Sequence, residues 1–154
     1  MDFNPFDEFS FATCGDDCAT SFWDRRKLSE PLRTLRDHSH WVWKVRYNLL
    51  HDELVLTSSS DGQVILSNLA SISSNAAMLN IDDSSDTDGE KGSSKAELLN
   101  EGMLRKFEDH EDSAYGIEWS VANPWYFASL SYDGRFVINK VPEHISNVMT
   151  LKQS

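Results

Sequence analysis

Two cysteines and five histidines are the side chains of this 154-residue chain that could ligate a metal or transfer protons. Cys14 and Cys18 have three residues between them, a spacing that could supply half of a zinc site. No second pair of ligands follows at a suitable spacing, and two acidic residues, Asp16 and Asp17, lie between the cysteines. Two cysteines are also too few for a disulfide scaffold and are consistent with a reducing compartment. The sequence therefore predicts no metal site and no cofactor.

Candidate catalytic groups are equally sparse. His51 and His144 have no nucleophile at a characteristic spacing. The chain contains no G-x-S-x-G motif, no glycine-rich phosphate loop and no H-E-x-x-H motif. The sequence therefore predicts that the protein is not an enzyme.

The charge and composition narrow the classes of partner. Fourteen basic residues against 25 acidic ones give a formal net charge of −11, which repels nucleic-acid backbones and anionic lipid surfaces. No segment approaches the roughly 18 continuous apolar residues of a membrane-spanning helix, and the first eleven residues do not resemble a secretory signal. We expect a cytoplasmic protein that neither binds nucleic acid nor inserts into a membrane.

Two other histidines belong to a sequence repeat. Asp61 aligns with Asp133, 72 positions later, and the match extends without a gap in both directions. The matching segments are 32–38 with 104–110, and 57–62 with 129–134. An offset of 44 residues brings in a third copy, in which Asp17 aligns with Asp61 and Thr13 with Thr57. A single alignment therefore relates three parts of the chain.

The hydrophobic pattern inside each copy has a period of two, which is typical of β-strands. The alternating residues are Trp41, Trp43, Val45 and Tyr47 in one copy, and Ser113, Tyr115, Ile117 and Trp119 in the next. Further β-rich runs at 54–58, 64–67, 125–129 and 135–139 are joined in pairs by Ser-Asp-Gly or Tyr-Asp-Gly turns, which favour hairpins. Each copy is predicted to form a small antiparallel meander.

The repeat length, the loop pair Asp37-His38, the turn aspartate and Trp23-Asp24 resemble the WD-repeat family, whose repeats each supply most of one four-stranded propeller blade. The resemblance implies an all-β partial β-propeller of about three four-stranded antiparallel blades, with one disordered acidic loop. It also implies a hydrogen-bonded network in two of the blades that ties their loops together. Carried over by position, the network residues are His38, Thr57 and Asp61, and His110, Ser129 and Asp133. The tryptophan that completes this network in the family is absent from both copies.

The copies divide the chain into four parts. Residues 1–68 hold the first blade and the start of the second, 69–102 an insertion, 103–141 the rest of the second blade and the last blade, and 142–154 a tail. The insertion is acidic and rich in serine, so it cannot bury enough apolar surface to become ordered. Ser85 and Thr87 each precede an acidic residue by three positions, which favours phosphorylation by acidophilic kinases. An unregulated linker is an equally open interpretation.

Three blades cannot close a ring that takes from about four to eight. We therefore expect a fragment or truncated product that needs the upstream blades of a longer chain, and that self-associates through its open ends when isolated. Closure by oligomerisation is the competing hypothesis.

A closer resemblance lies in residues 37–48, 64–68 and 128–135 together with the acidic insertion. They are similar to the C-terminal part of the EARP- and GARP-interacting protein family, also called the tumour-suppressing subchromosomal candidate family. The resemblance implies a non-enzymatic scaffold that binds these two tethering complexes at the trans-Golgi network and endosomes. Retrograde transport, endocytic recycling and secretory-granule maturation are the processes it implies.

Two tryptophans and two arginines are candidates for binding a partner protein. Trp41 and Trp43 adjoin the loop that carries His38, although strand alternation favours packing of Trp43 in the core. Arg25 and Arg26 follow Trp23-Asp24, and this W-D-x-R sequence resembles a motif through which some WD-repeat proteins engage the adaptor of cullin-RING ubiquitin ligases. A substrate receptor for ubiquitin ligation is therefore the alternative function.

Overall fold

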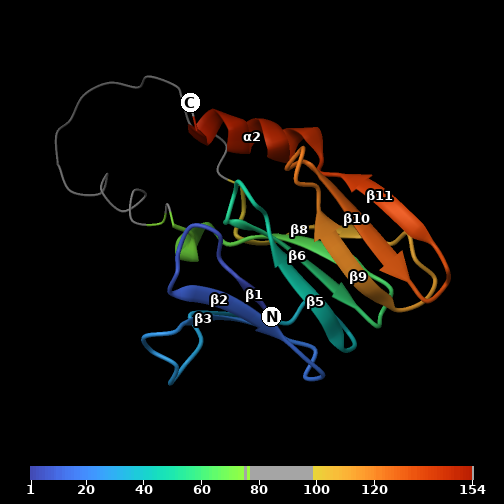
Figure 1. Cartoon of the computed structure of the whole chain (residues 1–154), viewed down its shortest axis with the longest axis horizontal. Helices are drawn as coiled ribbons and strands as arrows, with labels where there is room; N and C mark the ends of the chain where they lie inside the picture. Colours follow the sequence, from blue (N-terminus) through green and yellow to red (C-terminus); the bar gives the residue numbers. More distant parts are fainter. Residues whose placement is uncertain (75, 77–98, 154) are drawn as a thin grey trace.

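The fold is a row of antiparallel sheets, seen in a computed structural model that describes residues 1–74, 76 and 99–153 (Figure 1). The first sheet holds β1 (Asp2–Phe3), β2 (Ser10–Cys14), β3 (Thr20–Asp24) and β4 (Arg33–Leu35). The second holds β5 (Val42–Tyr47), β6 (Leu54–Ser59), β7 (Val64–Asn68) and β8 (Gly102–Phe107). The third holds β9 (Ala114–Trp119), β10 (Tyr126–Ser131) and β11 (Phe136–Lys140). In each sheet the strands follow one another in chain order, so the predicted meanders and the partial propeller are confirmed.

The core lies between the sheets, and this explains a difference in their burial patterns. One apolar cluster joins Phe22 of the first sheet to Val55 of the second, and another joins Leu54 and Leu56 to Trp119 of the third. The middle sheet is thus covered on both faces, and every residue of β6 and β7 is buried. In β10 buried residues alternate with more exposed ones, and in β11 half-buried residues alternate with exposed ones, because one face of the third sheet is uncovered in the described structure.

Repeated hydrogen bonds show that the three copies share one geometry. Asn4 Oδ1 accepts from the backbone N–H of residues two and three positions later, and Asn48 Oδ1 does the same 44 positions on. Asp17, Asp61 and Asp133 each accept from the N–H two residues later with Oδ1. These short loops and turns recur because the same residue type caps the same backbone groups.

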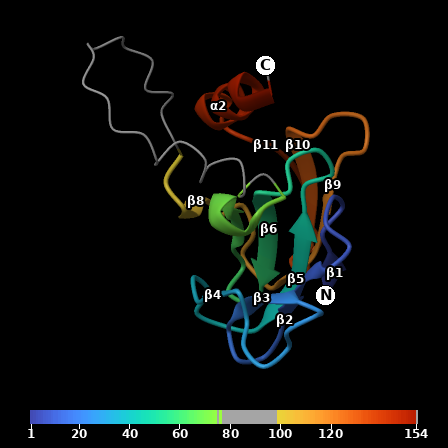
Figure 2. The ribbon, with the colours of Figure 1, turned by 90° about the vertical axis from the view of Figure 1, so that its left-hand side faces the viewer.

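The end of the chain differs from the expectation of three four-stranded blades. The third sheet has three strands within the described residues, and residues 143–153 of the expected tail form the helix α2 (Glu143–Gln153). Pro142 lies just before α2, where a proline fixes a helical φ and its missing N–H costs nothing. Ile145 and Met149 of α2 are fully buried in the cluster that contains Leu54, and α2 lies across one end of the strands (Figures 1 and 2).

The prediction that Trp43 packs in the core is wrong, since 43% of its surface is exposed. The pairing of β5 with β6 shifts between Val42 and Lys44, so two residues of β5 take the place of one. This bulge reverses the alternation, and Val42, not Trp43, shares the buried side with Val45. The pairing of β9 with β10 has the same irregularity, which leaves Tyr115 exposed in the equivalent position.

Cys18 occupies a backbone conformation that its two counterparts fill with glycine. Its φ is 60°, and Gly62 and Gly134 have φ of 79° and 80°. Because this region costs an L-residue about 1 kcal/mol or more, we expect Cys18→Gly to raise the free energy of unfolding by about 0.5–1 kcal/mol, measured by urea denaturation. Cys18→Ser keeps the strain while removing the thiol, and should leave stability unchanged. A loss of stability on Cys18→Gly would contradict the assignment of strain.

Candidate docking surface

The loop between β4 and β5 is held against the second blade by His38. The imidazole is buried, with Nδ1 3.0 Å from Asp61 Oδ2 and Nε2 2.8 Å from Thr57 Oγ1. Because a carboxylate only accepts, Nδ1 donates to Asp61. The next backbone N–H, that of Ser39, also donates to Asp61 Oδ2 at 3.0 Å. The structure therefore brings together the three residues that the WD-repeat resemblance places in one network.

The equivalent network of the third blade is looser. His110 Nε2 lies 2.8 Å from Ser129 Oγ, but Nδ1 is 3.4 Å from Asp133 Oδ2 and has no hydrogen-bond partner. The backbone N–H of Glu111 still donates to Asp133, at 2.9 Å. His38 is thus hydrogen-bonded at both ring nitrogens, and His110 at one.

Asp61 makes the stability of the second blade depend on acid pH. Burial alone would raise the pKa of Asp61, but hydrogen bonds from His38 and from the N–H groups of Gln63 and Ser39 lower it to about 2 from its ordinary 3.8. A lowered pKa stabilises the fold above about pH 4, and this contribution is lost as the pH falls toward 2. We expect the stability advantage of the native chain over Asp61→Asn to shrink by up to about 2 kcal/mol across this range in chemical unfolding. A constant difference would contradict this role.

Hydrogen bonds next to the His38 network position an exposed aromatic residue, Trp41. His40 O accepts from Ser59 Oγ at 3.1 Å, and Trp41 O accepts from the N–H of Ser60 at 2.9 Å. The backbone of residues 38–41 is thus bound step by step to the β6–β7 turn, while 48% of Trp41 stays exposed. An aromatic side chain on a fixed backbone loses little entropy on binding, which favours its use as an anchor.

Four aromatic residues form what we call the aromatic surface: Trp41, Trp43, Tyr115 and Tyr132. The indoles of Trp41 and Trp43 lie 6.1 Å apart and nearly perpendicular, and Trp43 Nε1 donates to Ser60 Oγ at 2.7 Å. The rings of Tyr115 and Tyr132 lie 4.6 Å apart. Ser113 Oγ donates to Ser60 O at 3.4 Å and the Ser113 carbonyl accepts from the Tyr132 N–H, so the loops that carry the two pairs are in contact across neighbouring blades.

Comparison with known proteins agrees with this geometry. A family model described as EIPR1 β-propeller matches residues 1–67. The chain is 54% identical over 145 residues to EARP and GARP complex-interacting protein 1 of Homo sapiens, which covers 92% of this chain and 38% of that protein. The chain is therefore similar to the EIPR1 β-propeller family. It is 45% identical to EARP-interacting protein 1 of Caenorhabditis elegans and 38% identical to WD repeat-containing protein DWA2 of Arabidopsis thaliana, again over 92% of this chain and 38% and 37% of theirs.

In this chain, the W-D-x-R motif is paired internally. Trp23 Nε1 donates at 2.9 Å to Thr13 Oγ1, and Thr13 is the counterpart of Thr57, so the first blade pairs this threonine with a tryptophan where the second pairs it with His38. Arg26 Nε donates to Asp24 Oδ1 at 2.9 Å, and this pairing lowers the pKa of Asp24 to about 2. Arg25 lies over the Phe9 ring at 5.0 Å, and both arginines remain more than half exposed.

The structure describes only some of the other candidate sites. Ser85 and Thr87 lie outside the described residues. Burial raises the pKa of the Cys14 thiol, which disfavours the thiolate that a metal would need. In the part of the chain that the structure describes, no three His, Cys, Asp or Glu side chains gather as metal ligands, and no helix is long and apolar enough to cross a bilayer.

Proposed function

We propose that the chain is part of a non-enzymatic WD-repeat scaffold that binds the EARP and GARP tethering complexes. Through them it acts at the trans-Golgi network and endosomes, as a cytoplasmic peripheral protein that supports retrograde transport, endocytic recycling and secretory-granule maturation. The observation that carries the proposal is the 54% identity, across 92% of this chain, to a protein named for its interaction with both complexes. Because the chain spans 38% of that relative, the partners belong to the longer protein as a whole.

The local geometry is compatible with docking. The blades are rigid supports, and their turns hold exposed aromatic side chains in place without closing a pocket around them. Large aromatic residues are enriched among the residues that dominate binding at protein interfaces.

Affinity purification of the full-length protein followed by mass spectrometry tests this function. We expect recovery of subunits of both tethering complexes, and no such recovery would overturn the proposal. Arg26→Ala is the informative variant for the alternative. Loss of a cullin adaptor on that change, without tethering subunits in the native sample, would favour the ubiquitin-ligase receptor.

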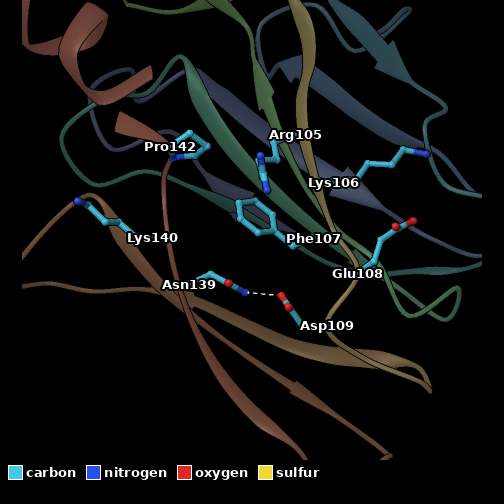
Figure 3. Close-up of a pocket in the computed structure, with 8 residues that line it drawn as sticks. All are labelled: Arg105, Lys106, Phe107, Glu108, Asp109, Asn139, Lys140 and Pro142. Atoms are coloured by element: carbon cyan, nitrogen blue, oxygen red, sulfur yellow. Dashed lines mark hydrogen bonds between the residues drawn. The ribbon is translucent and has the colours of Figure 1, made fainter. Parts of the chain in front are cut away.

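We further propose that blades outside this chain complete the ring. Among the described strands β11 pairs only with β10, and a groove of about 550 Å³ lies between β11 and β8. Asn139 Nδ2 donates to Asp109 Oδ2 across this groove at 2.9 Å, and the Phe107 ring points from β8 toward β11 (Figure 3). The first two sheets each have a fourth strand paired with their third, and the third sheet has no such strand among the described residues. An unpaired strand edge of this kind favours association with another strand.

The uncovered face of the third sheet predicts self-association of the isolated chain. Phe136 and Ile138 are 61% and 64% exposed, and they pair across the strands with Leu130 and Ala128 on the same face. We expect the 154-residue chain to sediment as oligomers, and Ile138→Lys combined with Phe136→Lys to shift it toward monomer in sedimentation velocity, because buried lysines oppose such contacts. Val121→Lys, at an 89% exposed loop position, is the control. A monomeric native chain would contradict the prediction.

A further inference from the structure

The aromatic surface is bordered by carboxylates of two blades. The Val42 N–H donates to Gly15 O at 2.9 Å, which places the turn carrying Asp16 beside Trp41. On the other side, Glu111 and Asp112 precede Ser113, whose side chain reaches the turn under Trp43. We call Asp16, Glu111 and Asp112 the acidic rim.

The acidic rim keeps unneutralised charge. Glu111 pairs with Arg135 at 2.7 Å, but Asp16 and Asp112 make no ion pair among the described residues. The Asp112 carboxylate accepts a hydrogen bond from the backbone N–H of Ser113. Other basic groups close to this end are Arg36, which donates to Asp17 O, the half-buried Lys44, and His40, whose ring centroid lies 5.1 Å from that of Trp41. The whole chain carries a net charge of −11, so the surroundings reinforce the rim instead of cancelling it.

We infer that the aromatic surface and its acidic rim bind a basic segment of a partner protein, with an arginine or lysine side chain stacked on the indole of Trp41. A guanidinium or ammonium group is attracted to the face of a tryptophan ring, and nearby carboxylates add a separate charge–charge attraction for the same cation. The perpendicular arrangement of the two indoles leaves part of each ring exposed, at 48% for Trp41 and 43% for Trp43. This inference names the chemistry of the partner segment and rests on the proposed docking function.

Peptide binding to the 154-residue chain tests the inference directly. The probe is a fluorescent twelve-residue peptide of alternating glycine and arginine, compared with a glycine–glutamine peptide of the same length in about 150 mM salt. We expect the arginine peptide to bind at least about ten-fold more tightly, and Trp41→Ala to weaken it about five- to ten-fold while Trp41→Phe preserves most of the binding. Asp16→Asn with Asp112→Asn should weaken it about three-fold or more, since both changes keep the side-chain shape.

Matched controls lie at the opposite end of the strands. Phe6→Ala and Glu8→Gln change an exposed ring and an exposed acid in the β1–β2 loop and should leave binding unchanged. Equal binding of the two peptides, or binding that persists in Trp41→Ala and responds only to total charge, would overturn the inference. If the full-length protein recovers tethering subunits but the peptide does not bind, the docking function stands and this inference fails. If the peptide binds but no tethering subunit is recovered, the basic-segment site stands and the partner is a different protein.

Discussion

Replacing His38 with alanine is expected to lower the free energy of unfolding by about 3 kcal/mol. The change removes both ring hydrogen bonds at once, and it leaves the buried Thr57 hydroxyl and the Asp61 carboxylate without their side-chain partner. Buried polar groups that lose a partner cost more than the bond itself contributed, because they remain away from water. Urea denaturation of the native and variant chains, followed by tryptophan fluorescence and by circular dichroism, measures the difference.

His110→Ala is the matched control, because the same ring occupies the same place in the next blade. His110 Nδ1 has no hydrogen-bond partner, so the replacement breaks one good bond in place of two. We expect a loss of about 1–2 kcal/mol there. Equal losses at the two positions would show that packing of the ring, and not the network, supplies the stability.

The repeated polar residues were the most informative part of the sequence. Asp61 and Asp133 occupy equivalent turns, and Asn4 and Asn48 equivalent loops, because each caps neighbouring backbone groups through contacts that span only a few residues. Such local interactions can be inferred from an alignment of the chain with itself. The predicted β-rich runs lie within one or two residues of β6, β7, β10 and β11, whereas β1 to β4 and β8 were not located individually.

The exposed aromatic residues were harder to predict. Strand alternation places Trp43 on the same side as Val45, and only the bulge between Val42 and Lys44 separates them. A bulge is one extra residue in a pairing between two strands, and a period of two in a single strand does not reveal it. The matching irregularity opposite Tyr115 could have been anticipated only after the first was known.

The helix α2 was missed for a different reason. Its stability comes from Ile145 and Met149, which pack against strand residues distant in the sequence such as Leu54. Short helices depend on tertiary contacts more than on their own propensity, so the local sequence carried little signal beyond Pro142. For the docking surface, too, the residue types were visible in the sequence while their adjacency across two blades was not.

Replacing Gly62 with alanine is expected to cost about 3 kcal/mol, because two penalties coincide there. Gly62 has a φ of 79°, which strains any side chain, and a Cβ atom would lie 3.2 Å from the backbone oxygens of His110 and Asp112 in the next blade. Backbone oxygens cannot turn aside as a flexible side chain would, so the second and third blades must separate slightly. That separation would disturb the contact between Ser60 and Ser113 which joins the two halves of the aromatic surface.

Gly134→Ala isolates the inter-blade part of this cost. Gly134 has nearly the same φ, 80°, but a Cβ there meets nothing within 4 Å. The free energy of unfolding of Gly134→Ala should therefore fall only by the cost of the backbone strain, about 1 kcal/mol, in urea denaturation. The excess of about 2 kcal/mol at Gly62 measures how tightly the two blades are pressed together beneath the aromatic surface. Equal losses at the two glycines would mean that the blades can move apart freely, and the surface that spans them would then not be rigid before its partner arrives.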